Sequence, residues 1–330
     1  MPEMPEPLKP LKTWSHLAKR RKRPSEYEVV SVKLHYHTNN PDKPWELDPD
    51  IHMNEWYRTY RNNSPLKHED WDEFRDPDAL IYRTYNLLQD GQENYVWGLF
   101  DQMSDRGHDK MIAAEWVDGL ARFYTPSRFP FHALQMASAY VQQMAPASTI
   151  TNCCTYQAAD HLRWVTHTAY RTRELANHFP GKGFAESERD IWEQDEAWQG
   201  IRELLEKVLV AWDWGEAFTA LNLVAKPAVE AALLEQLGDE ALRHNDTLLD
   251  LLTKAQLRDA ERHRRWAGAL VKMALEQEGN ADVLKGWIAK YMPLADAAVE
   301  AYCNALPEPE GRAEAAKESV RDFQQGLGLA

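Results

Sequence analysis

The spacing of hydrophobic residues divides the chain into a short first part and a long helical remainder. Between residues 29 and 37 hydrophobic and polar residues alternate, and this period of two predicts a strand. Four prolines within the first ten residues favour extended backbone, and the segment NNPDKPWELDPD at 39–50 predicts turns. We therefore expect residues 1–60 to form an extended arm with a short strand, and residues 61–330 to form a helical domain.

The long remainder of the chain has helical periodicity. Asp76 and Pro77 have the N-cap and first-turn signature of a helix start. Glycine and proline are rare in the segments where we expect long helices, which are 147–179, 200–237, 239–278 and 282–305. Pro227 lies inside one of these segments and predicts a kink. Long helices with short connections describe an all-α bundle.

The charge of the chain is unevenly distributed. Its net charge is −14, but residues 1–25 contain seven basic and two acidic side chains, so the rest of the chain carries −19. An acidic body of this size repels phosphate backbones and argues against nucleic acid as a partner. A run of five basic residues is therefore interpreted as a tether that docks on an acidic partner surface, with a nucleic-acid or lipid contact and a solvated arm as alternatives. These candidate partner contacts are Lys19, Arg20, Arg21, Lys22 and Arg23.

Tryptophan is unusually frequent, with thirteen residues in the chain. Those in the arm have little core to enter, so Trp14, Trp45 and Trp56 are further candidates for partner contacts. The tryptophans within helical segments are expected to fill the core instead. These are Trp97, Trp116, Trp164, Trp212, Trp214 and Trp266.

Neither the N-terminus nor the cysteines indicate secretion or membrane insertion. The opening residues, MPEMPEPLKPLK, lack the apolar segment of a signal peptide, and no run approaches the roughly 18 apolar residues of a membrane span. Cys153, Cys154 and Cys303 are too few for a disulfide framework, and their spacing does not support a zinc site. We expect a reduced, cytoplasmic protein with no membrane partner.

Two helical stripes carry residue types that bind metals. Asp160 and His167 share one face of their helix, and Asp259 and His263 lie in the middle of a second stripe. If the two helices face each other, each brings a carboxylate and a histidine to the same place. Such a cluster is either the start of a metal site or, more often, a hydrogen-bonded polar network in the core.

The spacing of the histidines does not support a di-iron centre. A carboxylate-bridged di-iron bundle uses Glu-x-x-His on two of its helices, and none of the twelve histidines has glutamate three residues before it. The only acid at that spacing is Asp105 before His108, and Gly107 between them indicates a turn. Glycine-rich phosphate loops and GxSxG elbows are also missing from the sequence. We therefore assign no catalytic, cofactor-binding or metal-binding residue in this chain.

Several stretches, in order along the chain, resemble one known family. They include HLRWVTHTAYRTREL at 161–175, WDWGEAFTALNLV at 212–224 and NDTLLDLLTKAQLRDAERHRRWAGALVKMALE at 245–276. An earlier stretch, DPDALIYRTYNLLQDGQENYV at 76–96, matches in the same way. From about residue 12 to residue 305 the chain resembles the β subunit of bacterial multicomponent toluene monooxygenase hydroxylases, above all the toluene/o-xylene type.

This resemblance implies a role for the chain. Hydroxylases of the family are (αβγ)2 assemblies that hydroxylate aromatic rings, with O2 activated at a di-iron centre in the α subunit. Electrons arrive from NADH through a flavin reductase and a Rieske ferredoxin, and a small effector protein regulates the complex. The β subunit is a ferritin-like relative of α without the iron ligands. The resemblance thus implies an all-α, ferritin-like bundle with a non-catalytic, structural role.

The partners implied are the hydroxylase α and γ subunits and a second copy of this chain, with the effector protein and the Rieske ferredoxin reached through the complex. In this interpretation Asp160, His167, Asp259 and His263 form a polar network in the volume where a metal-bearing relative holds iron. Two alternatives stay open. One is an autonomous ferritin-like metal-binding protein with atypical ligands, and the other is a helical adaptor with a nucleic-acid-binding arm.

Overall fold

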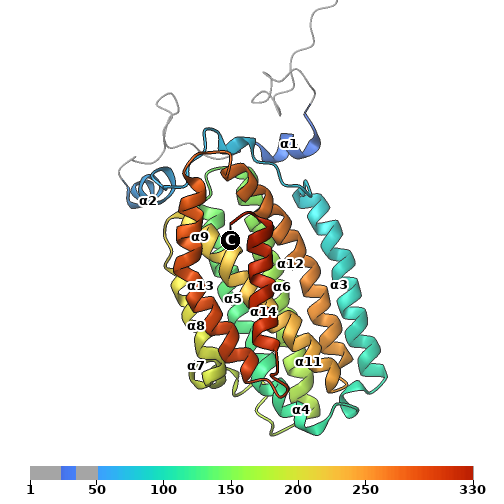
Figure 1. Cartoon of the computed structure of the whole chain (residues 1–330). Helices are drawn as coiled ribbons and strands as arrows, with labels where there is room; N and C mark the ends of the chain where they lie inside the picture. Colours follow the sequence, from blue (N-terminus) through green and yellow to red (C-terminus); the bar gives the residue numbers. More distant parts are fainter. Residues whose placement is uncertain (1–23, 35–50, 330) are drawn as a thin grey trace, which may run out of the picture.

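The computed structural model describes residues 24–34 and 51–329, and all regular structure in these two ranges is helical. The α-helices are α1 (Glu26–Ser31), α2 (His52–Tyr57), α3 (Tyr82–Asp105), α4 (Ala114–Gly119), α5 (Arg128–Met144), α6 (Ser148–His178), α7 (Glu188–Gln194), α8 (Glu196–Leu209), α9 (Trp214–Thr219), α10 (Lys226–Glu230), α11 (Leu237–Arg243), α12 (Thr247–Ala274), α13 (Asn280–Asn304) and α14 (Arg312–Gly326). Shorter π-helical segments are Arg58–Asn62, Leu120–Tyr124, Ala220–Ala225 and Ala231–Gln236, and 3-10 turns are Trp71–Glu73, His108–Lys110 and Thr125–Ser127. The long helices run side by side in one bundle, with α1 and α2 at the same end (Figure 1), which confirms the predicted all-α bundle.

A single helical run, Trp214–Arg243, is the most deeply buried part of the bundle. It consists of α9, α10 and α11 joined by two π-helical segments. An 18-residue window within it has a mean hydropathy of 1.3 and is 100% buried inside the protein. Length and composition alone would suit a membrane span, but they are equally those of a core helix in a soluble bundle. Pro227 does not end this run, because it lies in the first turn of α10, directly after a π-helical segment.

Helix α3 lies at the edge of the bundle and packs mainly on α12 (Figure 1). Its C-terminal half is held by a small apolar cluster in which Val96 and Phe100 pack with Leu248 and Leu252 of α12. Its N-terminal half turns polar side chains toward the bundle instead. The attachment of α3 therefore changes along its length from apolar packing to hydrogen bonds and charge.

The strand predicted for residues 29–37 is wrong where the structure describes it. Glu26–Ser31 form α1, and residues 35–37 lie outside the described ranges. The Ser25 hydroxyl accepts the backbone N–H of Glu28 at 3.2 Å, and the Glu28 carboxylate accepts the N–H of Ser25 at 3.0 Å. This reciprocal capping box favours a helix start. Local capping thus outweighs the alternation of hydrophobic residues.

The helix start predicted at Asp76 is placed too early. Asp76 does cap the backbone, but its carboxylate accepts the N–H groups of Asp78 and Leu80, each at 3.0 Å, and so closes a turn. Ala79 within this turn has a φ of +48°, a left-handed conformation that interrupts a helix. Helix α3 accordingly begins at Tyr82.

Five of the six tryptophans expected in the core are buried or partly buried, and one is exposed. Buried positions are occupied by Trp116, Trp164, Trp214 and Trp266, and Trp97 is partly buried. The prediction for Trp212 is wrong, because this residue lies in the loop between α8 and α9 and its side chain is 46% exposed.

Candidate functional site

Asp160 on α6 is fully buried and is the centre of a polar network between three helices. It accepts the Tyr85 hydroxyl at 2.9 Å and the Gln89 amide at 2.6 Å, both from α3. From α12, the Arg262 guanidinium and His263 Nε2 contact its other oxygen, His263 at 2.8 Å. One carboxylate therefore joins α3, α6 and α12.

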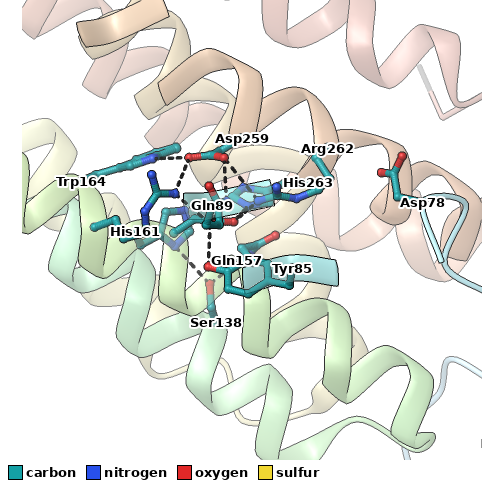
Figure 2. Close-up of polar contacts among 12 residues, drawn as sticks. Asp78, Tyr85, Gln89, Ser138, Gln157, His161, Trp164, Asp259, Arg262 and His263 are labelled. Carbon is teal, nitrogen blue, oxygen red and sulfur yellow. Dashed lines mark hydrogen bonds and ion pairs between the residues drawn. The ribbon is translucent and has the colours of Figure 1, made fainter. Parts of the chain in front are cut away.

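Asp259 on α12 supplies a second buried carboxylate to the same network. Trp164 Nε1 donates to it at 3.1 Å, and Gln89 Nε2, which also binds Asp160, donates to it at 3.1 Å. Figure 2 shows Gln89 lying among Trp164, Asp259 and His263. A single amide nitrogen from α3 thus connects the acids of α6 and α12.

Two guanidinium groups neutralise these acids. Arg262 Nη2 contacts Asp160 and lies 3.4 Å from Asp259. Arg163 Nη1 lies 3.4 Å from each of the two carboxylates. A buried carboxylate without a counter-charge is costly, whereas opposite charges that are buried together and hydrogen-bonded offset much of that cost. The two aspartates and two arginines form a charge-balanced cluster.

Glu93 and His167 form the outer edge of the network. Arg163 Nε binds Glu93 at 2.5 Å, and His167 Nε2 lies 3.1 Å from the same carboxylate. Trp97 Nε1 also donates to Glu93, at 2.9 Å. Burial lowers the pKa of His167. Because Glu93 is partly exposed, the network reaches the surface at this edge.

Two neutral histidines complete the network. The rings of His161 and His263 have centroids 5.5 Å apart, and burial holds the pKa of both well below its usual range. Because neutral His263 donates Nε2–H to Asp160, its Nδ1 carries no proton. His161 Nδ1 lies 3.4 Å from the Ser138 hydroxyl, which also accepts the Gln157 amide at 3.0 Å (Figure 2).

A second buried ion pair lies on the central helical run. Lys226 Nζ binds Glu230 at 2.7 Å within α10, and Arg264 of α12 binds the other Glu230 oxygen at 3.0 Å. Lys226 and Glu230 are both fully buried, and burial lowers the pKa of Lys226. The positive charge of Lys226 also lowers the pKa of His161 and His263. Fixed cations, as well as apolar packing, therefore hold the interior together.

These residues do not fit a di-iron centre. Within residues 24–34 and 51–329, no group of three or more His, Cys, Asp or Glu side chains is placed to hold a metal ion. His161 and His263 follow Ala158 and Ala260 at the spacing where Glu-x-x-His requires glutamate. The positive charge opposite the buried acids is already supplied by guanidinium groups.

The structure places the four predicted polar-core residues as follows. Asp160 binds His263 directly, and Asp259 is joined to Asp160 through Gln89. His167 lies at the edge of the network rather than at its centre. The helices that carry the two polar stripes therefore face each other, as the sequence-based hypothesis requires.

Sequence reasoning missed the contribution of α3. Tyr85, Gln89 and Glu93 are spaced four residues apart, so they form a polar stripe on one face of a helix. That stripe is a signal that could have identified them. Arg163 and Arg262 could not be identified in this way, because arginine next to acids on a helix is usually solvent-exposed.

Among the predicted partner contacts, Trp56 lies in the described part of the chain. Its indole donates to the Tyr140 hydroxyl at 3.0 Å and packs against Trp212, with ring centroids 5.2 Å apart. Trp56 is partly buried in this aromatic group. Outside the described residues lie Trp14, Lys19, Arg20, Arg21, Lys22, Arg23 and Trp45. The partner contacts and the domain boundary at residue 60 stay predictions.

The fold and the sequence together define the class of protein. The family described as methane/phenol/alkene hydroxylase matches residues 56–278, and the chain belongs to this family. Over 301 residues, the chain is 61% identical to the hydroxylase component subunit beta of the toluene-4-monooxygenase system of Ectopseudomonas mendocina, and the match covers 91% of this chain and 92% of that protein. The predicted resemblance to toluene monooxygenase hydroxylases is confirmed.

Two further comparisons extend this relationship. A solved structure of toluene 4-monooxygenase with toluene bound in the resting active site contains a chain that superposes with a TM-score of 0.85 and 61% identity, over 90% of this chain and 98% of that chain. The hydroxylase large subunit of propane 2-monooxygenase from Mycolicibacterium smegmatis is 24% identical over 216 residues, which cover 64% of this chain and 39% of that subunit. Subunits of different size in this family are therefore similar to the same chain.

Replacing Arg262 by methionine tests the charge balance of the cluster. The variant leaves Asp160 and Asp259 with one shared guanidinium, so we expect the free energy of unfolding to fall by about 3–5 kcal/mol in urea denaturation. Arg265→Met, three residues further along α12, removes a half-exposed ion pair with Asp78 and is expected to cost about 1 kcal/mol or less. Equal losses for the two variants would contradict the assigned role of Arg262.

The pKa of Asp259 predicts a pH dependence of stability. Burial, and then the negative charge of Asp160, raise this pKa to about 6, above the ordinary value of 3.8. The folded state therefore binds the proton more tightly than the unfolded state, and this contribution to stability is lost as pH rises through 6. We expect wild type to lose about 1 kcal/mol more unfolding free energy than Asp259→Asn between pH 5 and pH 7. Parallel stability curves across this range would contradict the assignment.

Proposed function

We propose that this chain is the β subunit, without an active site of its own, of the hydroxylase component of a di-iron aromatic monooxygenase acting on toluene and xylene. The observation that carries the proposal is the match, along nearly the whole chain, to a hydroxylase subunit beta at 61% identity. The buried network supports the non-catalytic part. Its acids are paired with Arg163 and Arg262, whose positive charges oppose the binding of a metal cation at the same place.

The role that follows is mechanical support of an iron-bearing partner. The chain would assemble with α and γ subunits and with a second copy of itself as (αβγ)2, in the cytoplasm. The di-iron centre would belong to α, and the effector protein and the Rieske ferredoxin would reach the complex without contacting a cofactor in β. The similarity of this chain to a hydroxylase large subunit supports a pairing of two related bundles. The acidic body of the chain gives no support to nucleic acid as a partner.

The alternative of an autonomous metal-binding protein with atypical ligands has no support in the described ranges. A metal site built from atypical ligands would still need several donor side chains converging on one point. Among residues 24–34 and 51–329 the structure places no such group, and the buried acids already have cationic partners.

Co-expression with candidate α and γ subunits, followed by native mass measurement, tests this proposal. We expect a complex with the mass of (αβγ)2. Removal of residues 1–23 is expected to weaken the complex, because this segment contains the five consecutive basic residues and Trp14. The helical fold of the remaining chain is expected to be preserved. Removal of residues 1–8, which contain no Lys, Arg or Trp, is the matched control and is expected to leave assembly unchanged.

Two results would count against these expectations, and they are distinguishable. If the full chain forms no complex with either subunit, the proposed function is wrong. If the chain without residues 1–23 assembles at wild-type affinity, only the docking role of the basic segment is wrong.

A further inference from the structure

A small cavity lies between α6, α12 and the turn that precedes α3. It offers about 10 Å³ to a water-sized sphere, and one water molecule needs about 10–15 Å³. Seven of its eight lining residues are buried. The cavity adjoins the acid–arginine network, because Arg262 and His263 line it and also bind Asp160. Its size therefore suits a ligand with a single heavy atom.

Three side chains of the lining carry a buried polar atom that no protein group binds. These atoms are Gln157 Oε1, His263 Nδ1 and Trp266 Nε1. Eleven such atoms occur in residues 24–34 and 51–329, so the lining of this one small cavity carries far more of them than an even distribution would give. A buried polar atom without a hydrogen bond costs free energy. Their grouping around one cavity indicates a ligand that they share.

The other contacts of these side chains determine what each free atom can do. Gln157 Nε2 donates to the Ser138 hydroxyl at 3.0 Å, which leaves the amide oxygen as an acceptor (Figure 2). His263 Nε2 donates to Asp160 at 2.8 Å, so Nδ1 of this neutral ring is also an acceptor. The indole N–H of Trp266 can only donate. One donor and two acceptors therefore belong to the same cavity.

This combination selects a neutral ligand that both donates and accepts. A cation cannot accept the Trp266 N–H, and the guanidinium of Arg262 in the lining opposes its charge. An anion without protons cannot donate to the two acceptors, Gln157 Oε1 and His263 Nδ1. Water accepts one hydrogen bond and donates two, and about three hydrogen bonds are typical of a buried water molecule.

We propose that this cavity is a binding site for one water molecule, which accepts the Trp266 N–H and donates to His263 Nδ1 and Gln157 Oε1. The water would join α6 to α12 beside the pairing of Asp160 with Arg262. Its bond to Nδ1 also holds His263 in the tautomer that donates to Asp160. The inference is independent of the proposed function, since the site uses residues of this chain alone.

Nuclear magnetic resonance of the full chain, labelled with 15N-tryptophan, tests the site in solution. The Trp266 indole N–H is assigned by its loss in Trp266→Phe, or from backbone connectivities if that variant does not fold. We expect a direct cross-peak between this N–H and water in rotating-frame spectra, whose sign separates a nearby water molecule from proton exchange. The reason is that the water oxygen would lie about 3 Å from Nε1.

Trp164 provides the matched control within the same spectrum. Its indole is also buried, and its ring centroid lies 6.2 Å from that of His263. Its N–H, however, donates to the Asp259 carboxylate at 3.1 Å. We therefore expect no water cross-peak of comparable intensity at Trp164. Equal cross-peaks at Trp164 and Trp266 would show general penetration of water into the core and would overturn the inference.

A crystal structure of the full chain or its complex, at a resolution that shows ordered water, tests the geometry. We expect one density peak at about 2.7–3.2 Å from each of the three atoms. Absence of this peak together with absence of the Trp266 cross-peak would contradict the proposal. Rotation of Gln157 or His263 that pairs the free atoms with protein groups would also contradict it, as would an anomalous signal from an ion at this position.

Discussion

The buried pairing of Asp160 and Asp259 with Arg163 and Arg262 is the interaction on which the rest of the structure depends. Each carboxylate would be costly to bury alone, and removal of either arginine would leave uncompensated charge in the core. Each helix carries one acid and one arginine, but Arg163 of α6 also contacts Asp259 of α12, and Arg262 of α12 also contacts Asp160 of α6. These cross pairs form only when the two helices face each other, so they favour the arrangement that apolar packing stabilises.

The same constraint explains the position and the shape of α3. Gln89 and Tyr85 satisfy oxygens of the buried acids, so this part of α3 is fixed by polar contacts, while an apolar cluster on α12 holds its other end. A helix held in this way leaves a polar groove beside α6 rather than a closed apolar seam. The buried polar network therefore shapes the surface between α3 and α6.

Hydrophobic periodicity was sufficient to predict the bundle, the helices expected at 147–179 and 282–305, and the two polar stripes on α6 and α12. The helices expected at 200–237 and 239–278 are wrong in their bounds, because the chain leaves the helix between α8 and α9 and again between α11 and α12. It could not show that the stripes meet, because periodicity determines which face of a helix is buried and not which helix covers it. At two places, two local signals in the sequence compete and the less obvious one determines the structure. Capping by Ser25 and Glu28 makes a helix where alternation suggested a strand, and Ala79 turns the chain where Asp76 suggested a helix start. The resemblance to one family supplied the function, which no isolated motif indicated.

The metal content of the assembled hydroxylase tests the central claim most directly. If the acid–arginine cluster replaces a metal centre in this chain, iron and manganese analysis of the purified complex will find one di-iron centre for each αβγ unit. This chain, purified alone and shown to be helical, will then bind no stoichiometric metal. A second metal centre per αβγ unit, or stoichiometric metal in the isolated chain, would contradict the account.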